Sequence, residues 1–98
     1  MVVIVVIIVV CRISVYIPSS NSLKNKRSVI KRVIHMLRNK FNVSVCELEQ
    51  QDALRNSTLG IVYVSNDRAV IDRTLSHIEE LLESYGDIHI TDFNVEII

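Results

Sequence analysis

An uninterrupted run of β-branched apolar residues restricts the fold more than any other feature of this sequence. Valine and isoleucine dominate residues 2–17, and both residue types favour extended backbone. Between Val2 and Val10, the side chains that would point to either side of a strand are all apolar, which is typical of a strand covered on both faces. We therefore predict a long central strand over residues 2–17.

The spacing of apolar residues predicts two helices and three further strands. Ser22 is a good N-cap for a first helix, and Asn66 or Asp67 for a second, with Gly86 as a suitable residue to end it. The predicted elements are a helix to about Asn39, strands over 42–50 and 58–65 with a turn at 51–56, a helix over 68–85 and a strand over 88–97. The expected buried helical residues are Leu23, Ile30, Val33, Ile34, Leu37 and Phe41, then Ile71, Leu75, Ile78, Leu82 and Tyr85.

This order of elements predicts the fold class. Two strand–helix–strand crossovers joined by a hairpin give an α+β, ferredoxin-like βαββαβ sandwich. The expected sheet is antiparallel, in spatial order 4-1-3-2, with both helices on one face. The 98 residues are enough for a single domain over 1–98.

The outer face of such a sheet has no element of the same chain to cover it. Because the first predicted strand is apolar on both sides, something else must cover that face. Our first expectation is a homodimer that packs sheet to sheet.

The net charge of zero hides a separation of charge along the chain. Residues 1–46 hold eight Lys and Arg and no Asp or Glu, a net charge of +8. Residues 47–98 hold eleven acidic residues and three arginines, a net charge of −8. A neutral total alone would argue against a nucleic-acid partner, but segregated charge indicates a binding surface.

Most of the basic charge falls on the first predicted helix. On a helical wheel, one stripe of roughly 20 Å holds Lys24, Arg27, Lys31, His35 and Arg38. The helix start adds free backbone N–H groups that favour an anion. The predicted RNA- or anion-binding residues are Ser22, Lys24, Lys26, Arg27, Lys31, Arg32 and Arg38. A solvated stripe, or one paired with carboxylates of the second helix (Asp72, Glu79, Glu80 and Glu83), fits the sequence equally well.

Other kinds of site have little support in the sequence. His35, His77 and His89 have no metal-ligand spacing with one another or with the cysteines, and no base neighbours Ser19, Ser20 or Ser22. We therefore predict no metal, no cofactor and no catalytic residues. Cys11 and Cys46 are expected to be reduced core thiols of a cytoplasmic protein, and the apolar start is too short to span a membrane.

Two classes of protein with known functions share this element order, but the sequence supports neither of them strongly. An RNA-recognition module would carry aromatics on its first and third strands, where only Tyr16 and Tyr63 are candidates. An acylphosphatase would need a glycine-rich loop and an arginine before the first helix, and the chain has only two glycines, Gly60 and Gly86.

Four segments resemble the YlxP-like family of small bacterial proteins of unknown function. They are SLKNKRSVI (22–30), LRNKFNVSV (37–45), LGIVYVSND (59–67) and DFNVEI (92–97). The matching signature positions are Ser22, Leu23, Lys24, Lys26, Arg27 and residues 42–45. The resemblance implies a ferredoxin-like fold and a role near the ribosome or RNA, with no settled enzyme activity. This chain departs from the family pattern in two places. Its first predicted strand is more uniformly apolar than is usual in the family. Near Asp52, where relatives often carry a tryptophan, this chain has Ala53-Leu54.

The leading functional prediction is a dimeric binding protein that docks structured RNA on the ribosome or its precursors. Charge would drive the binding, through the basic helix and the Ser22 helix start. The alternative is a protein–protein adaptor that uses the apolar sheet face and does not bind nucleic acid. An enzyme is the third and least supported class, because no acid–base constellation stands out.

Overall fold

The computed structural model describes residues 2–48 and 53–98, and its elements follow the predicted order. The turn predicted at 51–56 falls partly outside the described residues. The elements are β1 (Ile7–Tyr16), α1 (Leu23–Lys40), β2 (Ser44–Glu47), β3 (Asn56–Ser65), α2 (Arg68–Ser84) and β4 (His89–Ile97).

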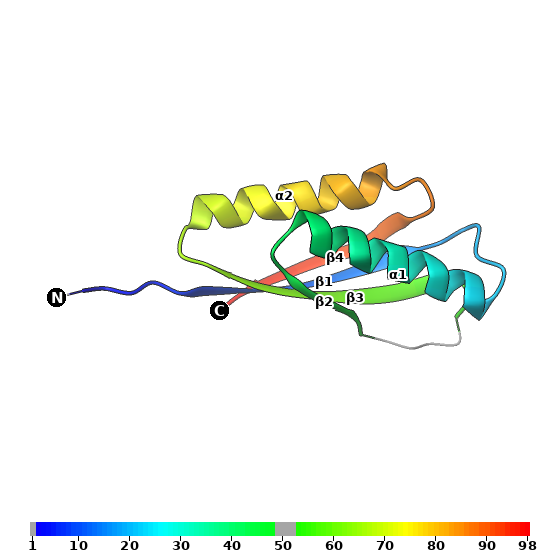
Figure 1. Ribbon diagram of the computed structural model, residues 1–98, viewed down its shortest axis with the longest axis horizontal. Helices are drawn as coiled ribbons and strands as arrows, with labels where there is room; N and C mark the ends of the chain where they lie inside the picture. Colours follow the sequence, from blue (N-terminus) through cyan, green and yellow to red (C-terminus); the bar gives the residue numbers. More distant parts are fainter. Residues whose placement is uncertain (1, 49–52) are drawn as a thin grey trace.

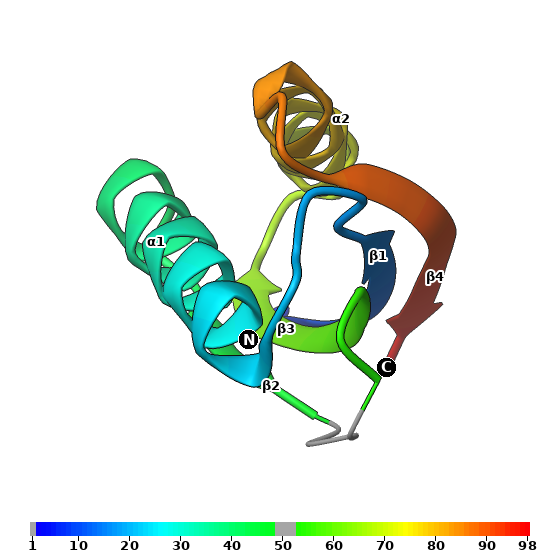
Figure 2. The same ribbon diagram turned by 90° about the vertical axis from the view of Figure 1, so that its right-hand side faces the viewer.

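The four strands form one antiparallel sheet in the order β2-β3-β1-β4, which confirms the predicted ferredoxin-like arrangement. β1 lies between β3 and β4, as its apolar sequence indicated. Both helices lie over the same face of the sheet, and Figures 1 and 2 show the opposite face bare.

The core lies between the sheet and the helices. Odd-numbered residues of β1 from Val9 to Ile13 are fully buried, and so are Val33 and Leu37 of α1. On α2, Ile71, Ile78 and Leu82 are buried, while Leu75 and Tyr85 pack partly against the core. The predicted helical stripes are thus confirmed, with Leu23, Ile34 and Phe41 at half-buried positions.

Residues 2–6 differ from the prediction, because they do not belong to the first strand. β3 ends at Ser65, opposite Ile7, and the last pairing with the C-terminal segment joins Ile8 to Ile98 by N–H···O bonds of 2.8 and 3.1 Å. A strand needs a neighbour, and none continues past Ile7. Residues 2–6 therefore project beyond the sheet, as Figure 1 shows, and the molecule measures 58 × 23 × 21 Å.

Cys46 is also placed differently from the expectation of two core thiols. Cys11 is fully buried, but Cys46 is exposed. The reason is strand alternation: Cys46 pairs with Gly60, and Gly60 pairs with Arg12 on the outer face. The side chain of Leu48 lies directly over Gly60. A Cβ atom added to Gly60 would be only 2.7 Å from Leu48 Cδ2.

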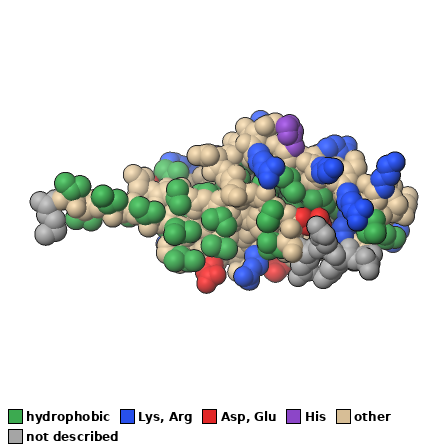
Figure 3. All heavy atoms as spheres, turned by 60° about the horizontal axis from the view of Figure 1, so that its bottom comes forward, with side chains coloured by type: hydrophobic (Ala, Val, Ile, Leu, Met, Phe, Trp, Pro, Cys, Tyr) green, Lys and Arg blue, Asp and Glu red, His purple; other side chains and the backbone are tan. Residues whose placement is uncertain are grey.

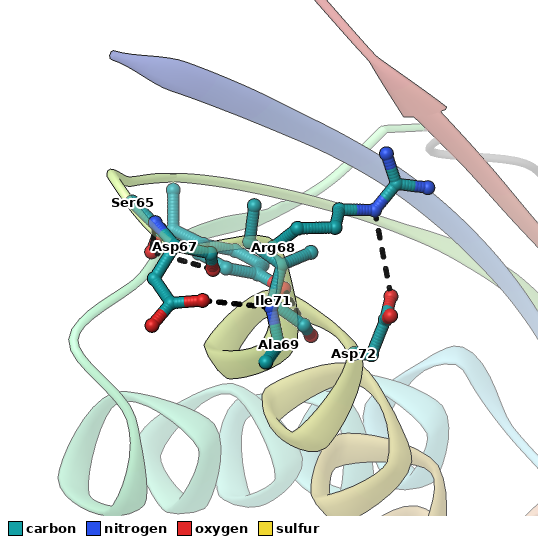
Figure 4. A network of polar contacts seen from close by, with 7 residues as sticks. Ser65, Asp67, Arg68, Ala69, Ile71 and Asp72 are labelled. Atoms are coloured by element: carbon teal, nitrogen blue, oxygen red, sulfur yellow. Dashed lines mark hydrogen bonds and ion pairs between the residues drawn. The ribbon is translucent and has the colours of Figure 1, made fainter. Parts of the chain in front are cut away.

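The ends of α2 are set by local hydrogen bonds. Asp67 caps the helix by accepting from the Ala69 N–H at 2.9 Å, and Ser65 Oγ accepts from the Asp67 N–H at 3.2 Å (Figure 4). At the other end, Tyr85 is the cap and Gly86 follows it, as predicted. No described residue has a positive φ, so Gly86 ends the helix without the left-handed conformation usual for such glycines.

Candidate nucleic-acid interface

The candidate interface begins at the start of α1, where Ser22 is the N-cap as predicted. Ser22 Oγ accepts a hydrogen bond from the Asn25 N–H at 3.0 Å, in extended backbone with φ −156° and ψ 161°. Ser20 is buried behind it and donates from its hydroxyl to the Ser22 carbonyl at 3.2 Å. The first turn contains no acidic residue, so the positive end of the helix dipole has no carboxylate of its own turn beside it.

The predicted basic stripe lies on the surface of α1. All of its members are exposed: Lys24, Arg27, Lys31, His35 and Arg38. Arg32, beside the stripe, and Lys40, at the end of the helix, are exposed as well. From Lys24 to Arg38 the stripe runs about 21 Å at 1.5 Å per residue. Its four exposed cations, Lys24, Arg27, Lys31 and Arg38, form a row long enough to contact several phosphates.

Arg38 is held in place by the sheet. Its guanidinium donates to the Val45 carbonyl at 2.9 Å. The Leu48 N–H donates to the Thr58 carbonyl across the β2–β3 pair, so by alternation the backbone groups of Val45 point to the open edge of β2. Arg38 therefore joins α1 to that edge.

Lys26 lies apart from the other predicted binding residues, because its side chain is only 3% exposed. Its ammonium donates to the Ala53 carbonyl at 2.8 Å. Lys26 thus fastens the start of α1 to the segment before β3. A phosphate outside the molecule does not reach a group enclosed in this way, so we remove Lys26 from the predicted contact surface.

The acidic residues of α2 do not neutralise the stripe. Within residues 2–48 and 53–98, the only ion pair is Arg68–Asp72, at 3.7 Å, and both of its members belong to α2 (Figure 4). Glu79, Glu80 and Glu83 are exposed. The carboxylate of Glu47 accepts a short hydrogen bond from the Ser57 hydroxyl. In the part of the chain that the structure describes, the basic stripe of α1 and the carboxylates of α2 are therefore exposed to solvent and make no ion pair with each other.

A polar hollow beside the stripe was missed by the sequence interpretation. It has a volume of about 190 Å³, and its lining includes Asn25, Ser28 and Arg32 of α1, Ser19 before the helix, and Asp87 after α2. Asn25, Ser28 and Arg32 recur at the i, i+3, i+7 spacing of one helix face. This spacing could have indicated a polar helix face from the sequence alone. It could not indicate that Ser19 and Asp87 lie beside that face, because their positions depend on the fold.

The outer sheet face is mainly apolar at the end nearest residues 2–6. Ile8, Val62 and Val64 are 37%, 42% and 66% exposed, and Figure 3 shows hydrophobic side chains gathered at that end of the molecule. A mostly apolar hollow of about 240 Å³ lies on this face around Gly60 and Cys46. Exposed apolar area of this kind is typical of an interaction surface.

The two candidate aromatics do not form a base-stacking pair. Tyr63 is buried on the helix side, where its hydroxyl donates to the Ile71 carbonyl at 3.3 Å. Tyr16 lies on the outer face at 38% exposure. The paired aromatic platform of RNA-recognition modules is therefore not formed by these two residues.

Two buried ionisable groups, Cys11 and Tyr63, have raised pKa values. Burial raises the pKa of the Cys11 thiol from 9.0 to about 11, so it is a poor nucleophile. Burial also raises the pKa of Tyr63. In the part of the chain that the structure describes, no three His, Cys, Asp or Glu side chains cluster as metal ligands, and no helix is long and apolar enough to cross a membrane.

Comparisons with known proteins agree with the resemblance in the sequence. A family model described as "Protein of unknown function (DUF503)" matches residues 8–95. The uncharacterized protein YlxP of Bacillus subtilis (strain 168) is 35% identical over 81 residues, which cover 83% of this chain and 86% of that protein.

Two solved structures have a similar outline. The de novo designed protein Foldit4 is 18% identical, with a TM-score of 0.47, over 95% of this chain and 96% of its own. SnoaB, a cofactor-independent oxygenase from Streptomyces nogalater, is 12% identical, with a TM-score of 0.46, over 97% of this chain and 92% of its own.

Proposed function

This chain belongs to the DUF503 family, whose function is unknown, and from its own surface we propose that it is a cytoplasmic, non-catalytic RNA-binding protein. The partner is structured RNA of the ribosome or its precursors. Lys24, Arg27, Lys31 and Arg38 contact successive phosphates along α1, with Arg32 beside them. The Ser22 helix start holds one further phosphate.

One observation carries this proposal: the stripe is exposed and without ion-pair partners among the described residues. Cations in the first turns of a helix oppose its dipole, so helix stability does not account for Lys24 and Arg27. An anionic partner does. The contacts are to the backbone, because Tyr16 and Tyr63 form no platform for base stacking, and recognition therefore rests on the shape of an RNA helix.

Reversal of charge in the stripe tests the proposal. In the double variant Lys24→Glu/Arg27→Glu, co-sedimentation with ribosomal particles should be lost. Arg73→Glu, an exposed cation of α2 outside the stripe, is the matched control and should bind as the native chain does. Equal binding by all three proteins would refute the role of α1.

The salt dependence of binding gives a second measurement. Each phosphate contact contributes about −0.7 to −0.9 to the slope of log K against log salt concentration. The native chain should therefore show a steep slope with a fragment of structured RNA. A single substitution Lys31→Ala should make it shallower by roughly one contact.

The second candidate function is a protein–protein adaptor, which the exposed apolar residues of the outer sheet face favour. An apolar interface is nearly independent of salt, whereas a phosphate interface is not. A pull-down with and without ribonuclease separates the two. Partners that survive ribonuclease and high salt, and are lost in Val62→Asp, would support the adaptor and contradict the RNA proposal.

A further inference from the structure

Residues 2–6 form an exposed apolar extension of β1. Val2, Val3, Ile4, Val5 and Val6 are 86%, 76%, 81%, 51% and 62% exposed. Their backbone makes no hydrogen bond within the part of the chain that the structure describes. They also precede the part matched by the family model, which begins at residue 8. The extension is therefore a feature of this chain apart from the basic helix and the matched core.

Such a segment is unstable when it stands alone in water. Every residue is β-branched and uncharged, and its N–H and C=O groups present an open edge ready for another strand. No proline, lysine or bulge blocks that edge. A partner that supplies both backbone hydrogen bonds and apolar side chains would therefore stabilise the segment.

We propose that the partner is a second copy of this chain, paired antiparallel through residues 2–6 about a two-fold axis at Ile4. The segment reads Val-Val-Ile-Val-Val in both directions. Ile4 then faces Ile4 of the second copy, Val2 faces Val6, and Val3 faces Val5. Each cross-strand pair joins two β-branched apolar side chains, which are favourable neighbours in a sheet. A two-fold contact closes on itself and does not lead to fibres.

The existing sheet determines which edge pairs. Ile8 exchanges both of its backbone hydrogen bonds with Ile98, on the β4 side. By alternation, the N–H groups of Val2, Ile4 and Val6 point to that side, and those of Val3 and Val5 point to the opposite side. The second copy thus pairs with the edge of residues 2–6 to which the N–H groups of Val2, Ile4 and Val6 point. Pairing there makes three hydrogen-bonded residue pairs, each with two N–H···O bonds.

The side chains support the same arrangement. Val2, Ile4 and Val6 continue the outer face on which Ile8 and Val64 are exposed. In the paired ribbon they lie beside their counterparts in the second copy, and the apolar strip becomes continuous across the two molecules. The basic stripe of α1 lies on the other side of the sheet and stays free.

Proline substitutions test the pairing and its edge together. Analytical ultracentrifugation of the native chain should show a monomer–dimer equilibrium in the micromolar range. Ile4→Pro removes an N–H that the pairing uses and should raise the dimer dissociation constant at least tenfold. Val3→Pro, the matched control, removes an N–H that faces solvent and should leave the constant within about threefold of the native value.

Three results would overturn the proposal. A native chain that is monomeric at 100 µM has no such contact. A dimer that survives Ile4→Pro but is lost in Val62→Asp would be joined through the sheet face. A monomer that sediments with phosphatidylcholine vesicles, and loses that ability in Ile4→Asp, would show that a lipid surface covers the segment instead.

Discussion

Lys24 and Lys26 lie two residues apart on α1, and the fold puts them in opposite environments. Lys24 is exposed on the stripe, while Lys26 is enclosed and donates to the Ala53 carbonyl. On a helical wheel Lys26 falls in the apolar sector, so the sequence itself indicates an environment different from that of Lys24. Its acceptor could not, because nothing in the sequence shows which loop lies over the start of the helix.

These two lysines give opposite expected outcomes. Lys26→Ala should lower the free energy of unfolding by about 2 kcal/mol, since it removes a charged hydrogen bond to a carbonyl. Lys24→Ala should change it by less than about 0.5 kcal/mol and should weaken RNA binding. Urea denaturation and fluorescence anisotropy with a labelled RNA hairpin measure the two quantities. A Lys26→Ala protein of native stability with lost RNA binding would contradict the assignment.

The buried Cys11 and Tyr63 make stability depend on pH in alkaline solution. Both have raised pKa values in the folded protein, Cys11 from 9.0 to about 11. Their contribution is complete below about pH 9 and is lost as the pH rises towards 11, because the unfolded chain gives up protons that the folded chain keeps. For Cys11 the loss amounts to roughly 2 kcal/mol.

Urea denaturation at pH 8 to 11 checks this expectation. The free energy of unfolding should fall over that range in the native chain and in Cys46→Ser, whose altered thiol is exposed. It should fall less in Cys11→Ala. An equal slope in all three proteins would mean that Cys11 does not contribute.

At the scale of the elements, Ser22 caps the start of α1 and is also proposed to help bind a phosphate. Two substitutions separate these roles. Ser22→Ala removes the cap on the Asn25 N–H and should cost about 1 kcal/mol of stability. Ser22→Asp keeps a good cap but adds a negative charge where a phosphate would bind. It should leave stability within about 0.5 kcal/mol and weaken RNA binding. Thermal unfolding and anisotropy distinguish the outcomes, and unaltered RNA affinity in Ser22→Asp would argue against a phosphate at this helix end.

The helices, β3 and β4 were predicted to within a residue or two, whereas the start of β1 was not. Helix ends carry local signals, and Ser22 and Asp67 act as caps as their sequence indicated. A strand ends where its neighbour ends, and this depends on residues far away in the sequence. β1 therefore begins at Ile7 although the apolar pattern starts at Val2, and Cys46 is exposed because of its register with Gly60.

At the scale of the whole molecule, the ferredoxin-like order, the sheet order and the shared helix face were all predictable. These follow from the sequence of element types and the handedness of crossovers. The sequence could not predict whether the basic and acidic halves of the chain form ion pairs. The helical wheel of the first helix is the same whether its basic stripe is paired with carboxylates or open to solvent. Within residues 2–48 and 53–98, the stripe of α1 is exposed and makes no ion pair with the carboxylates of α2, which favours the open arrangement there.

Because residues 2–6 lie beyond the sheet, the fold should not depend on them. Deletion of this segment should leave the free energy of unfolding within about 0.5 kcal/mol of the native value, since these side chains are 51–86% exposed. The comparison belongs at nanomolar concentration, where association does not add to stability. A large loss of stability would mean that the segment packs on its own molecule.

The bond between Arg38 and the Val45 carbonyl has an entropic consequence. A free arginine loses up to about 2 kcal/mol of rotamer freedom when it is immobilised. Arg38 has already lost part of that freedom in the unbound protein, because its guanidinium is bonded to the Val45 carbonyl. A phosphate that meets Arg38 would therefore be bound at a smaller entropic penalty than one that meets a freely rotating lysine of the same stripe.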